Sequence, residues 1–418
     1  MPSAVRTEIA GVSVVDLARR FGTPTYVYDA AMIRRRLAEL AAFDVVRYAQ
    51  KACSNLAVLD LVRRCGALVD AVSGGEIRRA LSAGFPPQGE PPPIVYTADI
   101  FDAEALDLCV QYGIHVNCGS PDMIVQYAGR NAGKEITLRI NPGFGHGHSR
   151  KTNTGGKQSK HGIWHEQLTD CLAMAERFGL TVVGLHAHIG SGSDLEHLSQ
   201  VCDALERAAL LVGPKLRSLN VGGGLPVVYR PGDKPFQPDA YFAVCDAFRK
   251  RLENRFQHPL RLEIEPGRYI VAESGFLIAE IRAVKRQDDN LFYLLDAGFN
   301  NLARPVLYGA YHPMSLAPVD GNTKRKQQSV IIGGPLCESG DIFTQRSGGY
   351  VVKRRLPAAQ VGDYLVIECA GAYGFTMSSN YNSRPLAAEV LIDEGRPMLI
   401  RRRQTFEDLV QDEEIPSH

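Results

Sequence analysis

Lys51 is the residue in this chain whose type and position most clearly suggest chemistry. It closes a short apolar run, Val45-Val-Arg-Tyr-Ala49, and small and polar residues follow it. Burial disfavours the charged form of an amine, so a lysine at the tip of a buried strand can lose its proton near neutral pH and act as a nucleophile. The alternative is a lysine whose amine simply reaches solvent from the strand end. Residues at the ends of later predicted strands help to decide between these two interpretations of Lys51.

Two glycine-bearing segments end later apolar runs. One is Asn220-Val-Gly-Gly-Gly224-Leu-Pro, and the other is Glu263-Ile-Glu265-Pro-Gly267-Arg268. Glycines let backbone N–H groups approach an anion with no side chain in the way, although glycine clusters more often simply make turns. Barrel enzymes commonly hold a phosphate in the loops after strands seven and eight. The position of these segments therefore favours a phosphate site.

A third segment, Gly184-Leu-His186-Ala-His188-Ile-Gly-Ser191, carries two histidines. Strand alternation puts His186 and His188 on the same side. A metal pair is one interpretation, but no carboxylate or cysteine stands at ligand spacing, so we expect no metal. A flat imidazole can instead stack on an aromatic cofactor while Ser191 reaches its phosphate.

The strand ends together offer an amine, an aromatic stacker, a phosphate cradle and the Glu265 carboxylate. Pyridoxal 5'-phosphate needs all four groups. Its aldehyde bonds to a lysine, its ring needs a partner on one face, its phosphate needs donors, and its ring nitrogen needs an anion. The sequence therefore predicts pyridoxal 5'-phosphate as cofactor.

These strand ends belong to eight short apolar runs separated by segments with apolar residues at helical spacing, such as 56–64 and 195–212. Strands that alternate with helices pair in parallel, and eight such units predict a closed (β/α)8 barrel. The eight runs are Val45–Ala49, Ala67–Val72, Ile94–Ala98, His115–Asn117, Ile136–Ile140, Thr181–His188, Ser218–Val221 and Leu262–Glu265.

The pattern changes past Arg268, where short β-like runs alternate with turn signals. We expect an α/β chain: a cofactor-binding barrel over residues 25–268, opened by a strand at Thr25–Tyr28, and a mostly β domain over 269–418. Residues 1–24, with an amphipathic helix at Val14–Arg20, are expected to pack on the β domain.

Bulk composition fits an ordinary globular enzyme. The chain has 418 residues, so two domains are the natural expectation. A formal net charge of +1 gives no reason to expect nucleic acid or a membrane surface as partner. Nine scattered cysteines without zinc spacing read as reduced thiols, and no apolar run could span a bilayer. We expect a cytoplasmic protein.

The ordered motifs identify a family. The chain resembles the diaminopimelate decarboxylases, which belong to the alanine-racemase-like barrel group of pyridoxal phosphate enzymes. The long loop from Asn141 to Trp164 resembles this branch in particular, whereas Cys53 stands where many relatives have asparagine. The motifs that carry the resemblance are Tyr48-Ala-Gln-Lys-Ala, Asp70-Ala-Val-Ser-Gly-Gly-Glu76, His188-Ile-Gly-Ser-Gly, Gly222-Gly-Gly, Glu265-Pro-Gly-Arg268, Cys337-Glu-Ser-Gly-Asp341 and Gly371-Ala-Tyr-Gly374.

The resemblance implies a role for each matching residue. Lys51 would bond to the cofactor's aldehyde, His188 would stack on the ring, and Glu265 would pair with the ring nitrogen. Cys337 would supply the proton after carbon dioxide departs, and in this family it comes from the partner subunit of a homodimer with shared active sites. Further cofactor contacts would come from Ser191, Gly224, Gly267, Arg268 and Tyr373. Substrate contacts would come from Arg268, Arg304, Tyr308, Glu338 and Tyr373.

The implied activity is decarboxylation of meso-2,6-diaminopimelate at its D centre, which yields L-lysine and completes lysine biosynthesis. The same chemistry on D-lysine, D-ornithine or carboxynorspermidine is the first alternative. A second alternative is a catalytically inactive regulator that keeps the fold, but the presence of both Lys51 and Cys337 disfavours it. A third alternative is a racemase.

Some residues keep two interpretations from sequence. Glu76 either lies near the cofactor or merely complements the dipole of the helix it begins. The histidines at 146, 148 and 161 could suggest a metal, but a mobile glycine-rich lid is the better interpretation of their loop.

Overall fold

The computed structural model describes residues 5–130, 134–145, 154–188, 190 and 194–416. The chain folds into two compact units. The barrel unit comprises residues 34–227 and 235–270, and the β unit comprises residues 1–33, 228–234 and 271–418.

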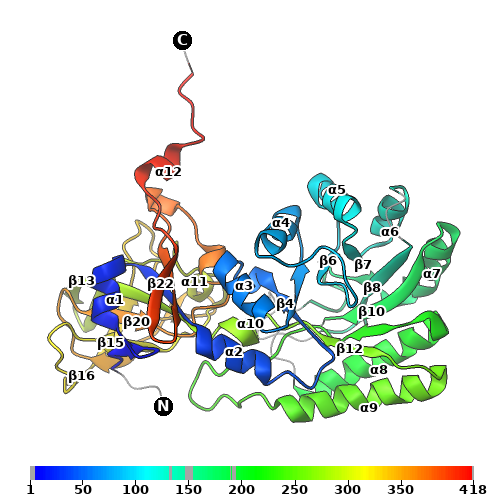
Figure 1. Cartoon of the computed structure of the whole chain (residues 1–418). Helices are drawn as coiled ribbons and strands as arrows, with labels where there is room; N and C mark the ends of the chain where they lie inside the picture. The colour runs from blue at the N-terminus through cyan, green and yellow to red at the C-terminus, as the bar shows by residue number, and fades with distance from the viewer. Residues whose placement is uncertain (1–4, 131–133, 146–153, 189, 191–193, 417–418) are drawn as a thin grey trace. The chain divides into compact units, whose positions relative to one another are not determined.

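Eight parallel strands close into a barrel in the first unit (Figure 1). Strand β12 pairs with β4, and β8 pairs with β10, so the eight-stranded ring has no open edge. A two-residue strand, β9 (Ile163–Trp164), extends the sheet beside β8. The predicted barrel is therefore confirmed. Its strands are β4 (Val45–Ala49), β5 (Leu68–Ala71), β6 (Ile94–Ala98), β7 (His115–Cys118), β8 (Glu135–Asn141), β10 (Thr181–Ala187), β11 (Ser218–Asn220) and β12 (Arg261–Ile264).

Helices lie outside the barrel strands, as Figure 1 shows for α4 to α9. Several begin at a side chain that accepts a backbone N–H of the first turn, among them Asn55, Ser73, Asp102 and Asp194. Such caps satisfy N–H groups that have no partner within the helix. The helices are α2 (Ala30–Ala38), α3 (Leu56–Arg64), α4 (Gly74–Ser82), α5 (Ala103–Tyr112), α6 (Pro121–Ala128), α7 (Leu168–Arg177), α8 (Leu195–Val212), α9 (Pro238–Phe256) and the short α10 (Arg268–Val271).

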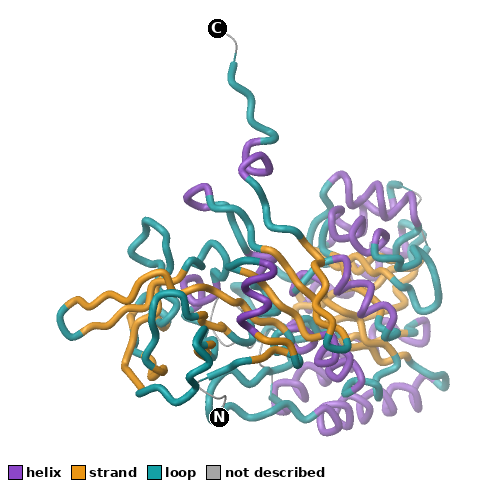
Figure 2. The backbone as a smooth tube through the Cα atoms, turned by 60° about the vertical axis from the view of Figure 1, so that its left-hand side comes forward, coloured by secondary structure: helices purple, strands orange, loops and turns teal. Residues whose placement is uncertain are grey.

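The β unit is built on one large sheet with the order β19-β16-β14-β13-β3-β21-β22, to which β20 and β15 add beside β13. Figure 2 shows how strands dominate this unit and helices the barrel unit. The strands are β3 (Thr25–Asp29), β13 (Gly275–Gln287), β14 (Asn290–Leu295), β15 (Met314–Ala317), β16 (Gln327–Gly333), β19 (Arg354–Pro357), β20 (Tyr364–Ile367), β21 (Ala388–Asp393) and β22 (Arg396–Arg401).

Shorter elements complete the β unit. Helix α1 (Val14–Phe21) buries Val14 and Leu17 against Ile278 of β13 and Val390 of β21. The other short elements are β1 (Glu8–Ile9), β2 (Val12–Ser13), β17 (Gln345–Arg346), β18 (Tyr350–Val351), α11 (Arg304–Tyr308) and α12 (Phe406–Val410).

The expected boundary at residue 25 needs correction. Strand β3 pairs with β13 and β21 of the large sheet, and residues up to 33 belong to the β unit. The physical reason is that the eight later strands already close the barrel, so β3 finds backbone partners only in the other sheet. A second departure is the segment 228–234, which lies within the sequence range expected for the barrel but belongs to the β unit.

Candidate active site

Lys51 lies in a short 3₁₀ turn, residues 50–52, directly after strand β4. Its neighbour Gln50 is fully buried and donates its amide N–H groups to the carbonyl oxygens of Asp70 at 3.2 Å and Glu76 at 3.1 Å. The turn is thereby fixed to β5 and α4. Lys51 itself is exposed, so the desolvated amine expected from sequence is not what the structure shows.

Three carboxyl groups surround the Lys51 ammonium within electrostatic reach. Burial raises the pKa of Asp70 well above its usual range, and the nearby Glu265 adds to that rise, while Lys51 opposes it. Burial likewise raises the pKa of Glu265 and of Glu76 against the pull of Lys51. The turn after β4 therefore brings a primary amine near the acids Asp70 of β5, Glu76 of α4 and Glu265, which directly follows β12.

The glycine segment after β11 packs between the ends of β10 and β12. A side-chain Cβ at Gly223 would lie 2.1 Å from the carbonyl oxygen of Glu265, and one at Gly224 would lie 2.0 Å from that of Gly190. Gly224 also has φ +87°, a conformation that only glycine adopts without strain. No other residue fits at these two positions. The N–H of Gly222 donates to Asn220 Oδ1 at 2.8 Å, and among the described residues the N–H of Gly224 has no acceptor.

His188 is linked directly to this loop. The backbone N–H of Gly223 donates to His188 Nδ1 at 3.2 Å, so that nitrogen accepts and the proton of the neutral ring lies on Nε2. Burial and the nearby Lys51 lower the pKa of His188 well below its usual range. The ring is a neutral, half-buried imidazole, which suits stacking.

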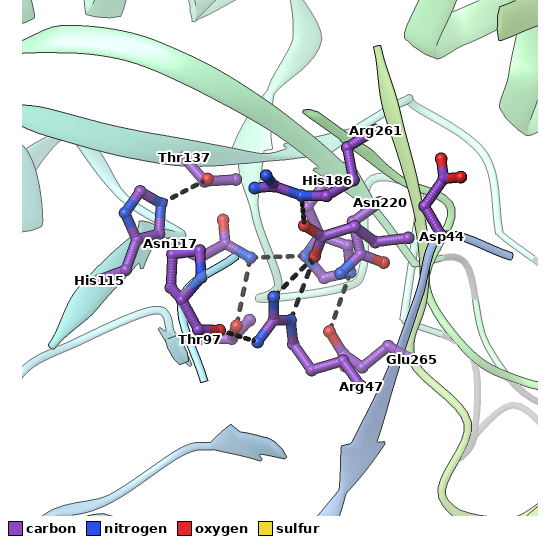
Figure 3. Close-up of polar contacts among 12 residues, drawn as sticks. Asp44, Arg47, Thr97, His115, Asn117, Thr137, His186, Asn220, Arg261 and Glu265 are labelled. Atoms are coloured by element: carbon purple, nitrogen blue, oxygen red, sulfur yellow. Dashed lines mark hydrogen bonds and ion pairs between the residues drawn. The ribbon is translucent and has the colours of Figure 1, made fainter. Parts of the chain in front are cut away.

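Glu265 and His186 meet deeper in the barrel (Figure 3). His186 Nε2 lies 3.6 Å from Glu265 Oε2, which is too long for a hydrogen bond, and among the described residues neither atom has another hydrogen-bond partner. A buried carboxylate oxygen without a partner costs free energy. A ligand that donates to Glu265 would remove that cost.

The segment after β12 contributes a further close backbone contact to the site. A Cβ at Gly267 would lie 2.9 Å from the carbonyl oxygen of Ala49 and close to Ala52, so glycine is required where β12 passes the Lys51 turn. Arg268 follows it, half-buried, as the first residue of α10. Lys51, His188, Gly224, Glu265, Gly267 and Arg268 are thus all at the C-terminal end of the barrel strands.

Other predicted site residues lie in the β unit. Arg304 begins α11 and is almost fully buried, with its Nη1 donating to the Tyr229 hydroxyl at 3.3 Å and to His312 Nε2 at 3.2 Å. No carboxylate pairs with Arg304 among the described residues, which leaves the guanidinium charge for an anion. Tyr308, at the other end of α11, and Tyr373, at φ +56°, are half-buried.

Cys337 and Glu338 are exposed on one loop of the β unit. The backbone N–H of Cys337 donates to Asn382 Oδ1 at 2.9 Å. The buried Asp341 fixes the loop base by accepting the N–H groups of Leu336 at 2.9 Å and Phe299 at 2.8 Å. An exposed thiol is thus presented on a rigidly anchored loop.

Several predictions have other outcomes. Ser191, His146 and His148 lie outside the described residues. His161 Nδ1 lies 2.6 Å from an oxygen of Asp99, and in the described part of the chain no group of His, Cys, Asp and Glu is arranged to hold a metal ion. Glu76, in the first turn of α4, lies near enough to Lys51 for that charge to act on its pKa, and its Oε2 accepts the N–H of Val72 at 2.9 Å.

Sequence reasoning assigned no role to several buried polar residues of the barrel, among them Gln50, Asp70, Asn117 and Arg139. Asp70 belongs to the Asp70–Glu76 motif, which carries the family resemblance but assigns it no role. Asn117 ends the fourth barrel run and Arg139 lies within the fifth, so their inward positions could have been read from strand alternation.

Comparison with known proteins agrees with this geometry. The family model described as "Pyridoxal-dependent decarboxylase, pyridoxal binding domain" matches residues 30–272. The diaminopimelate decarboxylase of Escherichia coli (strain K12) is 50% identical over 406 residues, which cover 97% of both chains. The chain belongs to the diaminopimelate decarboxylase family.

Solved structures of this family share the fold. A crystal structure of a diaminopimelate decarboxylase has a TM-score of 0.94 at 49% identity, covering 98% of this chain and 99% of that one. The Helicobacter pylori diaminopimelate decarboxylase, complexed with L-lysine, has a TM-score of 0.83 at 31% identity, covering 95% and 98%. In the described part of the chain, no helix is both long and apolar enough to cross a membrane.

The family's cofactor is pyridoxal phosphate, and the residues present fit it. In the glycine loop, which excludes any Cβ, the backbone N–H of Gly224 has no acceptor among the described residues and is left for a phosphate. The buried carboxyl group of Glu265 suits a protonated ring nitrogen. Lys51 supplies the amine that an aldehyde requires.

Proposed function

We propose that this chain decarboxylates meso-2,6-diaminopimelate at its D centre and releases L-lysine and carbon dioxide. The observation that carries the proposal is 50% identity over 97% of the chain to a diaminopimelate decarboxylase, combined with an amine, an imidazole, a glycine cradle and a carboxylate at one end of the barrel. The reaction would complete lysine biosynthesis in the cytoplasm.

In the barrel unit, we propose that Lys51 bonds to the cofactor, His188 covers one face of its ring, and Glu265 accepts its ring N–H. The glycine loop around Gly224, with Ser191, Gly267, Arg268 and Tyr373, would bind the phosphate side. The neutral state of His188 supports the stacking role, because a charged imidazole would repel a protonated ring. When bound, the cofactor takes up the electron pair left as the bond to carbon dioxide breaks.

The β unit would recognise the rest of the substrate. Arg304 is buried without a carboxylate partner among the described residues, which supports a role in binding the distal carboxylate together with Arg268 and Tyr308. The exposed Glu338 would bind the distal ammonium, and the hydroxyl of Tyr373 would complete the contact.

Cys337 would donate the proton to the carbon that has lost carbon dioxide. Its exposed position supports the proposal that it serves the active site of a partner subunit in a homodimer. Removing a placed proton donor costs roughly 10²–10⁴-fold in rate. Cys337→Ala should therefore lose activity on that scale and still bind cofactor with normal affinity.

The test is incubation of cofactor-loaded protein with meso-diaminopimelate, followed by measurement of carbon dioxide and of L-lysine. Equal amounts of both are expected, and their absence would overturn the proposal. D-lysine, D-ornithine and carboxynorspermidine lack the second carboxylate or the second amino-acid centre, so kcat/KM should be highest for diaminopimelate. A higher value for any of the other three would assign the chain to that substrate.

A further inference from the structure

His186 and Glu265 form an unusual pair in the barrel interior. Both side chains are buried, at 0% and 5% relative exposure. The two unpartnered atoms of the pair, Nε2 and Oε2, face each other at 3.6 Å (Figure 3). Neighbours at this separation form a hydrogen bond after a shift of a few tenths of an ångström, and catalytic hydrogen bonds are often long in ligand-free structures.

Asn117 fixes which nitrogen of His186 carries the proton. Its Nδ2 lies 2.8 Å from His186 Nδ1 and 3.2 Å from Thr97 Oγ1. An amide nitrogen only donates, so His186 Nδ1 accepts and the proton of the neutral ring lies on Nε2. That N–H is the one that points toward Glu265.

The orientation of the Asn117 amide is itself determined by its surroundings. The Thr97 hydroxyl hydrogen-bonds to Asp70, so its oxygen receives the second N–H of Asn117. The chain of donors therefore runs from Asn117 in two directions, through Thr97 to Asp70 and through His186 to Glu265. Rotating the amide would place its oxygen against the Thr97 oxygen, whose own proton is directed to Asp70, so the Thr97 contact selects the orientation shown.

The charges around His186 keep it neutral. Burial lowers its pKa well below the usual range, and the cations Arg139, Lys51 and Arg47 and the neighbouring His188 lower it further. Glu265, which lies beside it, has its own pKa raised by burial. A neutral N–H donor beside a buried carboxyl group favours the ionised form of that group, because it can stabilise the negative charge without itself carrying a positive charge.

We propose that His186 is a positioning residue: in the Nε2–H tautomer fixed by Asn117, it holds the Glu265 carboxylate ionised and oriented, with its second oxygen free for the cofactor's ring nitrogen. This inference rests on the role of Glu265 in the proposed function. His186 touches neither substrate nor cofactor in this scheme and acts only through Glu265.

The first test needs no cofactor and no variant. In protein carrying ¹⁵N-labelled histidine, long-range ¹H–¹⁵N spectra distinguish a protonated from an unprotonated ring nitrogen. Single His→Gln variants assign the signals. We expect His186 to carry its proton on Nε2 from pH 6 to 8. A proton on Nδ1, or a doubly protonated ring, would overturn the proposal.

The second test compares two variants of the full-length holoenzyme. His186→Gln keeps an N–H donor near the Nε2 position, whereas His186→Leu removes it. A hydrogen bond to a charged group contributes enough for its loss to lower affinity or rate by about 10- to 100-fold. We therefore expect His186→Leu to weaken pyridoxal phosphate binding and lower kcat on that scale with little change in KM, and His186→Gln to stay within a few fold of the original protein.

The absorbance of bound cofactor gives a readout that a merely structural role would not change. Loss of the ionised Glu265 should shift the pH dependence of the cofactor's absorbance band in His186→Leu but not in His186→Gln. His115→Gln, which changes another barrel histidine that bonds to Thr137, is the matched control and should leave the band unchanged. Equal spectra and equal kcat for all three variants would overturn the proposal.

Failure of the proposed function has a different signature. If Glu265→Gln binds cofactor with an unaltered spectrum and full activity, Glu265 is not the partner of the ring nitrogen and its assigned role is wrong. If Glu265→Gln is impaired and His186→Leu is not, only the present inference fails. Should His186→Leu not fold, the tautomer measured in the unsubstituted protein decides.

Discussion

Glu263 and Glu265 are two residues apart at the end of β12, both are almost fully buried, and their pKa values move in opposite directions. Burial pushes the pKa of Glu263 up, but the adjacent Arg47 and Arg261 outweigh it, and the net pKa is lowered. Glu265 has burial as its dominant influence, and its pKa is raised. Two identical side chains at the end of one strand thus have pKa values shifted in opposite directions.

The difference lies in the partners. Glu263 Oε2 accepts from Arg47 Nη2 at 3.0 Å, Glu263 Oε1 accepts from Arg261 Nε at 2.8 Å, and Arg47 also donates to the carbonyl of Pro92 at 2.8 Å. Toward the C-terminal end, Asp70 Oδ1 and Glu265 Oε2 have no partner among the described residues. The N-terminal end of the barrel completes its own polar network. The C-terminal end leaves polar atoms for a ligand, at a cost to stability.

The largest effects should come from replacing two cations one at a time: Arg47, in β4, and Lys51, in the turn after it. Lys51→Ala should abolish activity, by roughly 10⁴-fold or more, because removal of a covalent catalyst has effects of that scale. Its exposed side chain predicts little change in stability. Arg47→Met, four residues earlier, should instead destabilise the fold. Steady-state rates and denaturant unfolding of both variants check the contrast, and an active Lys51→Ala protein would contradict it.

The two glutamates should separate stability from activity. Glu263→Gln leaves the buried Arg47 without its counter-charge and should cost about 3–5 kcal/mol in the free energy of unfolding. Glu265→Gln removes an unsatisfied buried carboxyl group and should change the stability of the cofactor-free protein by less than about 1 kcal/mol, while it impairs the holoenzyme.

Urea unfolding followed by tryptophan fluorescence measures this contrast in the barrel alone, since Trp164, the single tryptophan of the chain, lies in β9. Equal losses of stability in the two variants would show that the polar atoms at both ends of the barrel are equally well paired.

The fold was largely predictable because the barrel repeats one local pattern. Each strand of the barrel is a short apolar run followed by polar or glycine residues, and each appears in the structure at the predicted place. The sequence could not indicate where β3 pairs, since Thr25–Asp29 reads as a strand in either unit. Its partners, β13 and β21, are about 250 and 360 residues away in sequence, and no local signal reports pairing at such separation.

Spacing or a motif marked Lys51, His188 and Glu265 as candidate site residues, and the structure places all three at the C-terminal ends of barrel strands. What could not be predicted was the state of each group. The tautomer of His186 depends on Asn117, and the opposite pKa shifts of Glu263 and Glu265 depend on Arg47. These partners come from different strands and meet only when the barrel closes.

His115, in the polar network at the N-terminal end of the barrel, should make the free energy of unfolding depend on pH. Burial, aided by Arg47, lowers the pKa of His115 to about 4, whereas an unfolded histidine titrates near 6.5. Between pH 6.5 and 4, His115 is therefore protonated in the unfolded chain but not in the folded chain. The contribution of neutral His115 to the free energy of unfolding is present above pH 6.5 and is lost as the pH falls toward 4. Between pH 7 and 5 the loss should be about 2 kcal/mol.

His115→Gln should remove that contribution and keep a donor for Thr137. The decrease in the free energy of unfolding between pH 7 and 5 should then be smaller in the variant than in the original chain by about 2 kcal/mol. Using the difference between the two proteins isolates His115 from His186 and His188, which also titrate below their usual range. Identical pH profiles would mean that His115 is protonated as easily in the fold as outside it.

The smallest effect is expected at the rim of the same N-terminal network. Arg217 pairs with Glu135 there, but the two side chains remain 51% and 48% exposed. Water screens such a pair and ordering the side chains costs entropy, so Arg217→Ala should change stability by only about 0–1 kcal/mol. Arg47, at 2% side-chain exposure, has the same chemistry and a several-fold larger predicted effect. A loss at Arg217 as large as that at Arg47 would show that the whole network acts as one unit, and that burial alone does not separate its strong pairs from its weak ones.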